Sequence, residues 1–277
     1  MNKPEIAVRD SVTRIEGLNG AVLVAGSHGG VYAGYAAAKG RMRAVILNDA
    51  GVGRDQAGIG ALAWLQAIDF PAATVGHDTA ALGDGAAMIA TGVISHANPA
   101  ALALGVIPGM ACAQAAERLR DAGPPAERIP EIAESCRLLM VGPPQVWALD
   151  SNAMVDARHV GAIVVTGSHG SYLGTDPRTA LKADAFAALY NDACADPKFA
   201  ATTRLPALDE RGIAAATVSA ASARIGDALS TYADGILSHV NQTARAMGGR
   251  PGMSAHIFVT LLSARWRLGS GGDRDRP

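Results

Sequence analysis

Histidine and aspartate side chains that could exchange protons with a substrate recur as matched pairs in this sequence. An imidazole titrates near neutral pH and a nearby carboxylate can orient it, so the two together are typical of general acid–base catalysis. The members of each pair lie 141 or 143 positions apart and have similar neighbours. The predicted catalytic residues are His28, His169, Asp49, Asp192, Asp84 and Asp227.

Side chains suited to holding a substrate mostly follow the same paired pattern. An arginine can bind a substrate carboxylate through two parallel hydrogen bonds, and the N–H groups of a glycine-rich backbone can stabilise developing negative charge. Serine, asparagine and histidine add further hydrogen-bonding groups. The predicted substrate-binding residues are Ser27, Ser168, Asn48, Asn191, Arg54, Arg224, His96 and His239.

These residues lie mostly at the ends of apolar runs that alternate with helical patterns. The run "AVLVAG" at 21–26 leads into the turn "SHGG", and helices are expected over 31–40 and 55–68. Strands separated by helices indicate an α/β fold with a mostly parallel sheet covered on both faces. Because ligands bind outside the carboxyl ends of such strands, we expect the polar turns to open onto one pocket.

The sequence also repeats itself, which is how the pairs are recognised. "GAVLVAGSHG" at 20–29 matches "GAIVVTGSHG" at 161–170, and "GVISHAN" at 92–98 matches "GILSHVN" at 235–241. We infer a tandem duplication with repeats at 1–135 and 140–277, joined by a linker, as two lobes related by a pseudo-twofold axis. Residues 268–277 are glycine-rich and charged and are predicted to form a disordered tail.

Several paired residues also have a purely structural interpretation. An aspartate or asparagine directly before a helix can cap its free N–H groups, and a proline after it strengthens the signal. The other polar pairs could bond loop backbone or lie satisfied in the core. The capping interpretation applies to Asp84, Asp227, Asn98 and Asn241, and the second one to Asn48, Asn191, Ser95, Ser238, His96 and His239.

The two repeats differ at positions close to these pairs. The first has "GVGRDQAG" at 51–58, whereas the second has "CADPKFAA" at 194–201. The first has His77 and Asp78 where the second has Ala220 and Ala221, and Arg224 occurs only in the second. These differences favour one composite site, or one active and one altered site, over two equal sites; drift in loops is the alternative.

The set of residues favours a small-molecule metabolic enzyme, and we predict a hydrolase of an amide-like bond in a small polar or carboxylate-bearing substrate. A lyase or isomerase could use the same residues, and histidine with aspartate could instead hold a divalent metal that activates water. Cys194 is an alternative nucleophile. A non-catalytic small-ligand-binding protein and a structural subunit are the other classes. No organic cofactor is predicted, because no complete nucleotide-binding motif is present.

The composition limits the classes of partner that we expect for the protein. The 277 residues carry a formal net charge of −1, so no basic excess indicates nucleic acid. The chain begins without an apolar leader pattern and has no long apolar run, so we expect a cytoplasmic protein without a membrane partner. Its three cysteines have neither disulfide-framework nor zinc-site spacing. Apolar helices and sheet edges make a homo-oligomer an open alternative to a monomer.

Overall fold

The computed structural model describes residues 3–125, 127–194 and 198–271, without the side chains of 269–271. The chain divides into two compact units. The first consists of Met1–Ala133 with two short pieces of the later chain, and the second consists of the remainder of Glu134–Pro277. Each unit is an α/β structure built on its own sheet, and each is described separately.

The first unit has a five-stranded sheet in which the strands follow one another in sequence order. Neighbouring strands from β1 to β4 are parallel, and β5 runs antiparallel to β4. The strands are β1 (Ile6–Arg9), β2 (Val22–His28), β3 (Ala44–Asn48), β4 (Ala72–Val75) and β5 (Ile94–Ala97). The expectation of a mostly parallel sheet is confirmed for this unit.

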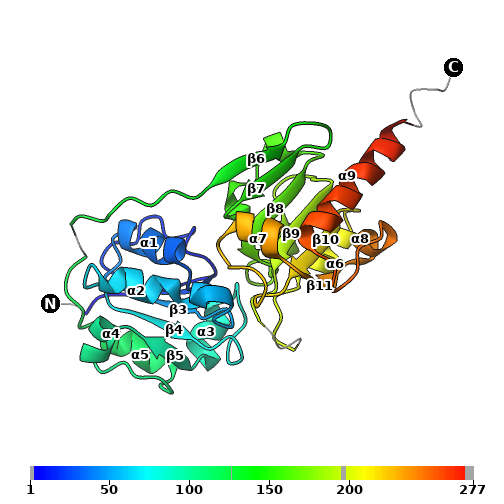
Figure 1. Cartoon of the computed structure of the whole chain (residues 1–277). Coiled ribbons are helices and arrows are strands. Elements are labelled where there is room, and N and C mark those ends of the chain that lie inside the picture. The colour runs from blue at the N-terminus through cyan, green and yellow to red at the C-terminus, as the bar shows by residue number, and fades with distance from the viewer. Residues whose placement is uncertain (1–2, 126, 195–197, 272–277) are drawn as a thin grey trace. The chain divides into compact units, whose positions relative to one another are not determined.

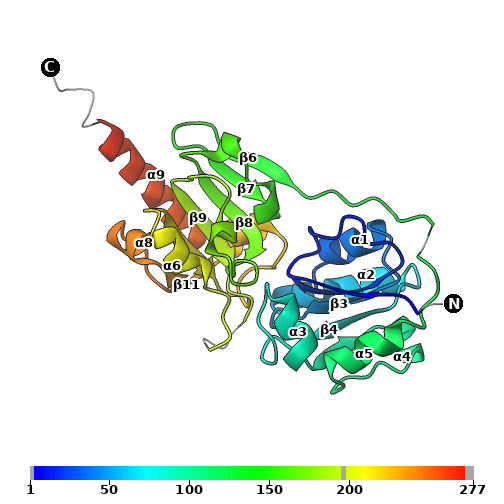
Figure 2. The ribbon, with the colours of Figure 1, turned by 180° about the vertical axis from the view of Figure 1, so that it is seen from behind.

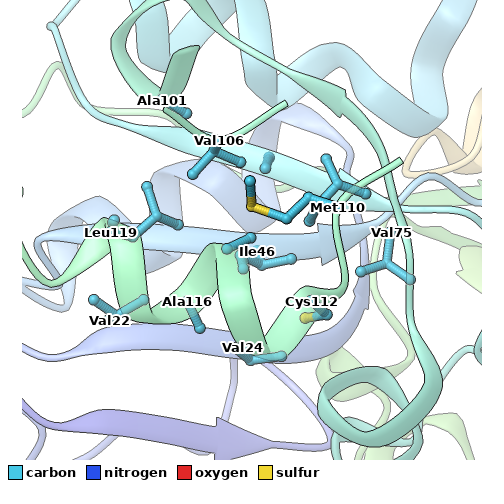
Figure 3. Close-up of a cluster of buried hydrophobic side chains, with 14 of the residues drawn as sticks. Val22, Val24, Ile46, Val75, Ala101, Val106, Met110, Cys112, Ala116 and Leu119 are labelled. Atoms are coloured by element: carbon cyan, nitrogen blue, oxygen red, sulfur yellow. The ribbon is translucent and has the colours of Figure 1, made fainter. Parts of the chain in front are cut away.

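Helices cover both faces of this sheet (Figures 1 and 2). One face carries α1 (Val31–Lys39) and α2 (Gly60–Gln66), and the other carries α3 (Gly85–Thr91), α4 (Pro99–Ala103) and α5 (Cys112–Leu119). Alternate residues of a strand point to opposite faces, so Val22 and Val24 pack towards α5 while Leu23 packs towards α1. Figure 3 shows the α5 side, with Leu119 among the buried side chains.

The second unit has a six-stranded sheet of related topology. Strands β7 (Val146–Leu149), β8 (Ile163–His169), β9 (Ala187–Asn191) and β10 (Ala214–Val218) are parallel, and β11 (Leu237–Val240) is antiparallel to β10. The sixth strand, β6 (Cys136–Met140), pairs antiparallel with β7 at the edge. This strand lies in the segment that the sequence indicated as a linker. It forms by pairing with β7, and hydrophobic periodicity in a sequence does not reveal such a pairing.

Helices lie on both faces of the second sheet as well (Figure 1). The helices α7 (Ala228–Asp234), α8 (Gln242–Ala246) and α9 (Ala255–Gly271) cover one face, and α6 (Arg204–Asp209) with the short 3-10 turn Pro177–Ala180 covers the other. The described residues 170–186, between β8 and β9, contain no α-helix in the position of α1. Pro177 disfavours helical backbone before it, and Asp176 caps a short 3-10 turn instead.

Three element boundaries differ from the sequence-based expectations. Strand β2 continues through Ser27 and His28, so these residues end the strand rather than form the turn after it. The helix expected over 55–68 is a 3-10 turn at Arg54–Ile59 followed by α2, because Asp55 and Gln56 have non-helical backbone. Helix α9 includes residues 268–271 of the predicted tail, and residues 272–277 lie outside the described residues.

None of the helices in the described residues has both the length and the apolar character needed to cross a membrane.

Candidate active site

The carboxyl ends of β2, β3 and β4 lie in register at one edge of the first sheet. Within the ladder His28 is opposite Asn48, and Asn48 is opposite Val75. The next residues continue this row, because the Asp49 N–H donates to the Val75 carbonyl at 2.9 Å. His77 follows β4 by two residues. The fold therefore brings both imidazoles and the Asp49 carboxylate to one edge.

Asp49 and His77 form a hydrogen-bonded pair at this edge. The His77 Nδ1 lies 2.9 Å from Asp49 Oδ1, and the His77 backbone N–H also donates to that oxygen at 3.0 Å. The Gly51 N–H donates to it as well, at 3.0 Å. The Asp49 side chain is 6% exposed and that of His77 is 25% exposed. A buried carboxylate thus fixes the orientation of an imidazole that reaches solvent.

The electrostatics of Asp49 favour its ionised form. Burial by itself would raise the pKa of the carboxyl, but hydrogen bonds from the His77 ring, the Gly51 and His77 N–H groups and the Ser95 hydroxyl outweigh it and lower the pKa. An ionised Asp49 only accepts hydrogen bonds, so the proton of neutral His77 is on Nδ1. Its Nε2 then carries the lone pair that a general base needs.

Ser95 joins the pair from the neighbouring antiparallel strand. The register of β4 and β5 places His96 opposite Thr74, so Ser95 lies near the end of β4. Its Oγ lies 3.1 Å from Thr74 Oγ1 and 3.1 Å from His96 Nδ1, and its hydroxyl helps to lower the pKa of Asp49. The predicted substrate-binding residue His96 therefore contacts the pair through Ser95.

The second unit repeats this arrangement without the histidine. Asp192 accepts hydrogen bonds from the N–H groups of Cys194 at 3.2 Å and Ala220 at 2.8 Å, and the Ser238 hydroxyl also favours its ionised form. Burial raises the pKa of Asp192, and these bonds do not offset it. Asp192, Cys194 and Ala220 are at most 3% exposed. The same edge of the second unit is therefore closed where the first presents His77.

His28 has a different state from the one expected of a general base. Its Nδ1 accepts the Gly30 N–H at 3.1 Å, and desolvation lowers the pKa of His28 to about 4. The ring is therefore neutral at pH 7 and carries its proton on Nε2, where it is a hydrogen-bond donor. His169 is 6% exposed and accepts the Ser171 N–H at 3.3 Å in the same way.

The glycines of the repeated "GSHG" are required by close backbone approach. A Cβ on Gly26 would lie 2.6 Å from the Asp84 backbone nitrogen, and one on Gly167 would lie 2.5 Å from the Asp227 nitrogen. Real Cβ atoms do not approach other atoms this closely. The first glycine of each motif therefore lets the loop before α3 or α7 pack on the strand end.

The serine and asparagine pairs bond the backbone that surrounds the edge. Ser27 Oγ accepts the Val12 N–H at 3.0 Å, and Ser168 Oγ accepts the Asn152 N–H at 2.8 Å. Asn48 bonds the Ala50 N–H and the Ala80 carbonyl. Asn191 bonds the corresponding groups of Ala193 and Ala223. These side chains, predicted to bind substrate, instead hold the loops around the strand ends of their own units.

The remaining acidic and asparagine pairs cap helices. Asp84 accepts the Ala87 N–H at 2.8 Å at the start of α3, and Asp227 does the same for Ser230 in α7. Asn98 and Asn241 cap α4 and α8.

Two further aspartates, absent from the sequence-based set, bond the first residues of α3 and α7. Asp10 accepts the Gly85 N–H and Asp150 accepts the Ala228 N–H, both at 3.1 Å. Their repeated "DS" after the first strand was the signal that could have found them.

The two arginines lie in unlike settings. Arg54 begins the 3-10 turn after β3, with its Nε 3.7 Å from Asp55. Arg224 forms an ion pair with Asp227 at 2.9 Å in the loop before α7. Both side chains are more than one third exposed.

The loop that leads to Arg54 has unusual backbone. Ala50, Val52, Asp55 and Gln56 have φ between 48° and 62°. Positive φ is rare outside glycine, above all for a β-branched residue, and strained backbone of this kind clusters at functional sites.

A metal-binding cluster is not found in the described residues: they contain no group of three or more His, Cys, Asp or Glu side chains that could hold an ion. None of the three cysteines forms a disulfide. Cys194 is 2% exposed, so its thiol is too buried for a nucleophile that a substrate must reach.

Comparison of the chain with protein-family models, with curated proteins and with solved structures found no match.

His77 is the member of the Asp49–His77 pair that the sequence-based set omitted. Its signal was present, since the repeats match at Asp49 and Asp192 but differ at His77 and Ala220. Selecting the catalytic candidates by their presence in both repeats excluded it.

Proposed function

We propose that the chain is an enzyme of small-molecule metabolism that uses Asp49 and His77 for general acid–base catalysis. The supporting observation is the 2.9 Å contact between a buried carboxylate and a partly exposed imidazole at the carboxyl edge of the sheet. A carboxylate that orients an imidazole with access to solvent is an arrangement suited to general acid–base catalysis.

The reaction we propose is hydrolysis of an amide-like bond in a small polar or carboxylate-bearing substrate. His77 Nε2 takes a proton from water while the water oxygen bonds to the carbonyl carbon, and the carbon–nitrogen bond then breaks as His77 returns the proton to nitrogen. Asp49 holds the ring and stabilises the imidazolium. Neutral His28 donates a hydrogen bond from Nε2 to the oxygen that becomes negative, a role in which a low pKa is an advantage.

We also propose that the two units descend from one duplicated unit and that the second has lost this chemistry. Corresponding hydrogen bonds surround Asn48 and Asn191, and Asp49 and Asp192. Ala220 replaces the histidine in the second unit. The pseudo-twofold relation of the lobes is part of the same proposal.

The test is a substrate screen followed by a matched pair of variants. Small cyclic amides and carboxylate-bearing amides are incubated with the protein in ¹⁸O-water, and the products are analysed by mass spectrometry. Hydrolysis places one ¹⁸O atom in the product. Turnover without incorporation would replace the hydrolase by a lyase or isomerase.

His77→Gln should lower turnover by about 10²–10⁴-fold and leave substrate affinity within a few-fold. His256→Gln, on the exposed side of α9, is the control and should change neither. Equal turnover in the wild type and His77→Gln would exclude the dyad. Ligand binding without turnover in either protein would indicate a binding protein instead.

A further inference from the structure

The second unit contains an open groove between α6 and the connection from β11 to α8. Its volume is about 330 Å³, and its lining includes Leu205, Pro206 and Val240 as apolar groups and His239, Asp209 and Arg245 as polar ones. The lining comes entirely from residues 202–245 of the second unit. None of these lining residues belongs to the first unit, which contains the Asp49–His77 pair.

Asp209 contributes a negative charge to this groove. Its Oδ1 accepts the Thr243 N–H and hydroxyl at 2.8 and 2.7 Å, and its Oδ2 accepts the Gln242 N–H at 2.8 Å. Burial opposes ionisation, but these bonds outweigh it and lower the pKa of Asp209. A carboxylate has about four acceptor positions, so Oδ2 has room for a further donor.

Bonding the first residues of α8 does not require this charge. At the corresponding place in the first unit, Gln66 Oε1 accepts the Ala100 N–H at 2.9 Å, so a neutral side chain bonds the start of α4. The residue there that corresponds to Arg245 is Leu102. The second unit therefore differs from the first by one added negative and one added positive charge in the groove.

One cation and one anion beside an apolar strip match a ligand that carries both charges. A simple anion would be repelled by Asp209 and a simple cation by Arg245, whereas a zwitterion pairs with both. His239 Nδ1 lies 3.3 Å from both Thr217 Oγ1 and Ser238 Oγ, which holds the imidazole in place in the groove wall. We propose that this groove binds a small apolar amino acid, with its carboxylate on Arg245, its ammonium on Asp209 and its side chain on Leu205 and Val240.

The experiment is an NMR titration of the full chain with L-valine, following backbone amide resonances. We expect shifts at Val240, Gln242 and Thr243 that saturate. N-acetyl-L-valine lacks the ammonium and isobutylamine lacks the carboxylate, and each should bind roughly tenfold more weakly or worse, because a hydrogen bond to a charged group is lost. Equal binding of all three, or no saturable shift with valine, would overturn the proposal.

Two variants reproduce the first unit's residues at these positions. Arg245→Leu and Asp209→Gln should each weaken valine binding by roughly tenfold or more. Arg250→Leu, an exposed arginine outside the groove lining, is the matched control and should bind as the wild type does. Gln66 bonds the start of α4 in the first unit, so a glutamine is compatible with this position and Asp209→Gln should fold. Dispersed amide spectra check this, and unchanged affinity in Arg245→Leu would contradict the proposal.

Discussion

At the scale of single residues, the two histidines at the edge of the first sheet differ in which ring nitrogen holds the proton, because their Nδ1 atoms have opposite partners. His77 Nδ1 faces a carboxylate and donates, whereas His28 Nδ1 faces the Gly30 N–H and accepts. The same side chain therefore presents a lone pair on Nε2 in one case and a proton in the other.

The state of His28 gives a prediction for stability. A histidine with a pKa of about 4 when folded and about 6.5 when unfolded binds fewer protons in the folded state. Its contribution to stability is thus complete above pH 6.5 and is lost as the pH falls towards 4. We expect His28→Asn, whose Oδ1 can accept the Gly30 N–H, to flatten the decline of unfolding free energy over this range.

Denaturant unfolding at several pH values between 7.5 and 4 measures this effect. His256→Asn is the control, since that histidine is exposed. An identical pH dependence in wild type and His28→Asn would show that His28 is protonated normally in the folded protein.

Asp49 and Asp192 form a natural comparison in which the His77 ring is the main difference. The pKa of Asp49 is lowered, so its contribution to stability is present above its unfolded pKa of about 4 and is lost as the pH falls. The pKa of Asp192 is raised, so its ionisation opposes folding as the pH rises. At pH 7, Asp49→Asn should lower the unfolding free energy by about 1–3 kcal/mol, and Asp192→Asn should raise it slightly.

Chemical denaturation of both variants at pH 7 and pH 4 checks this pair. The difference between them should shrink at pH 4, where Asp49 loses part of its advantage. A larger loss for Asp192→Asn at pH 7 would mean that its carboxylate is as well stabilised as that of Asp49.

Comparing the residues of the two repeats located the carboxyl edge of the sheet but did not show the role of each side chain there. The sequence shows that Asp49 follows a strand, and parallel topology then places it at the carboxyl edge. It does not show which donors surround a side chain, so the neutral His28 and the Asp49–His77 contact could not be predicted. Both depend on side chains and backbone groups from other strands and loops.

At the scale of elements, the glycine that begins each "GSHG" motif controls how a loop packs on a strand. Gly26→Ala should lower the unfolding free energy by about 1–3 kcal/mol or more, because the new Cβ would meet the backbone of Gly83 and Asp84. Gly123→Ala is the matched control, since a Cβ there meets nothing within 4 Å. Equal stability of the two variants, measured by thermal unfolding, would contradict the close packing.

The alternation of strands and helices along the chain could be predicted from hydrophobic runs and turn residues. Three features of the fold were not predicted. Strand β6 has no partner pattern in sequence and forms against β7. The 3-10 turn at Arg54–Ile59 contains positive φ values at Asp55 and Gln56. A sequence indicates positive φ mainly where it has glycine, and neither residue is one. The missing counterpart of α1 follows from Pro177, whose effect was readable in principle.

At the scale of the whole molecule, the proposed chemistry needs no metal ion. We expect the purified chain to keep its catalytic rate and its thermal midpoint after treatment with a chelator and gel filtration. Metal content measured by mass spectrometry before and after treatment accompanies the assay. A loss of activity that a divalent ion restores would replace His77 as the base by metal-activated water.

In each unit, the alanine that follows Asp49 or Asp192 has backbone in the left-handed region, which lowers the thermal stability of the protein. Ala50 and Ala193 have φ of 48° and 56°, a conformation that costs an L-residue about 1–2 kcal/mol and glycine very little. Ala50→Gly should therefore raise the melting temperature by a few degrees, even after the entropy that glycine adds to the unfolded chain. Ala63→Gly, on an exposed helical position, should lower it. Glycine adopts the same left-handed backbone, so Ala50→Gly should keep the shape of the turn while removing this cost.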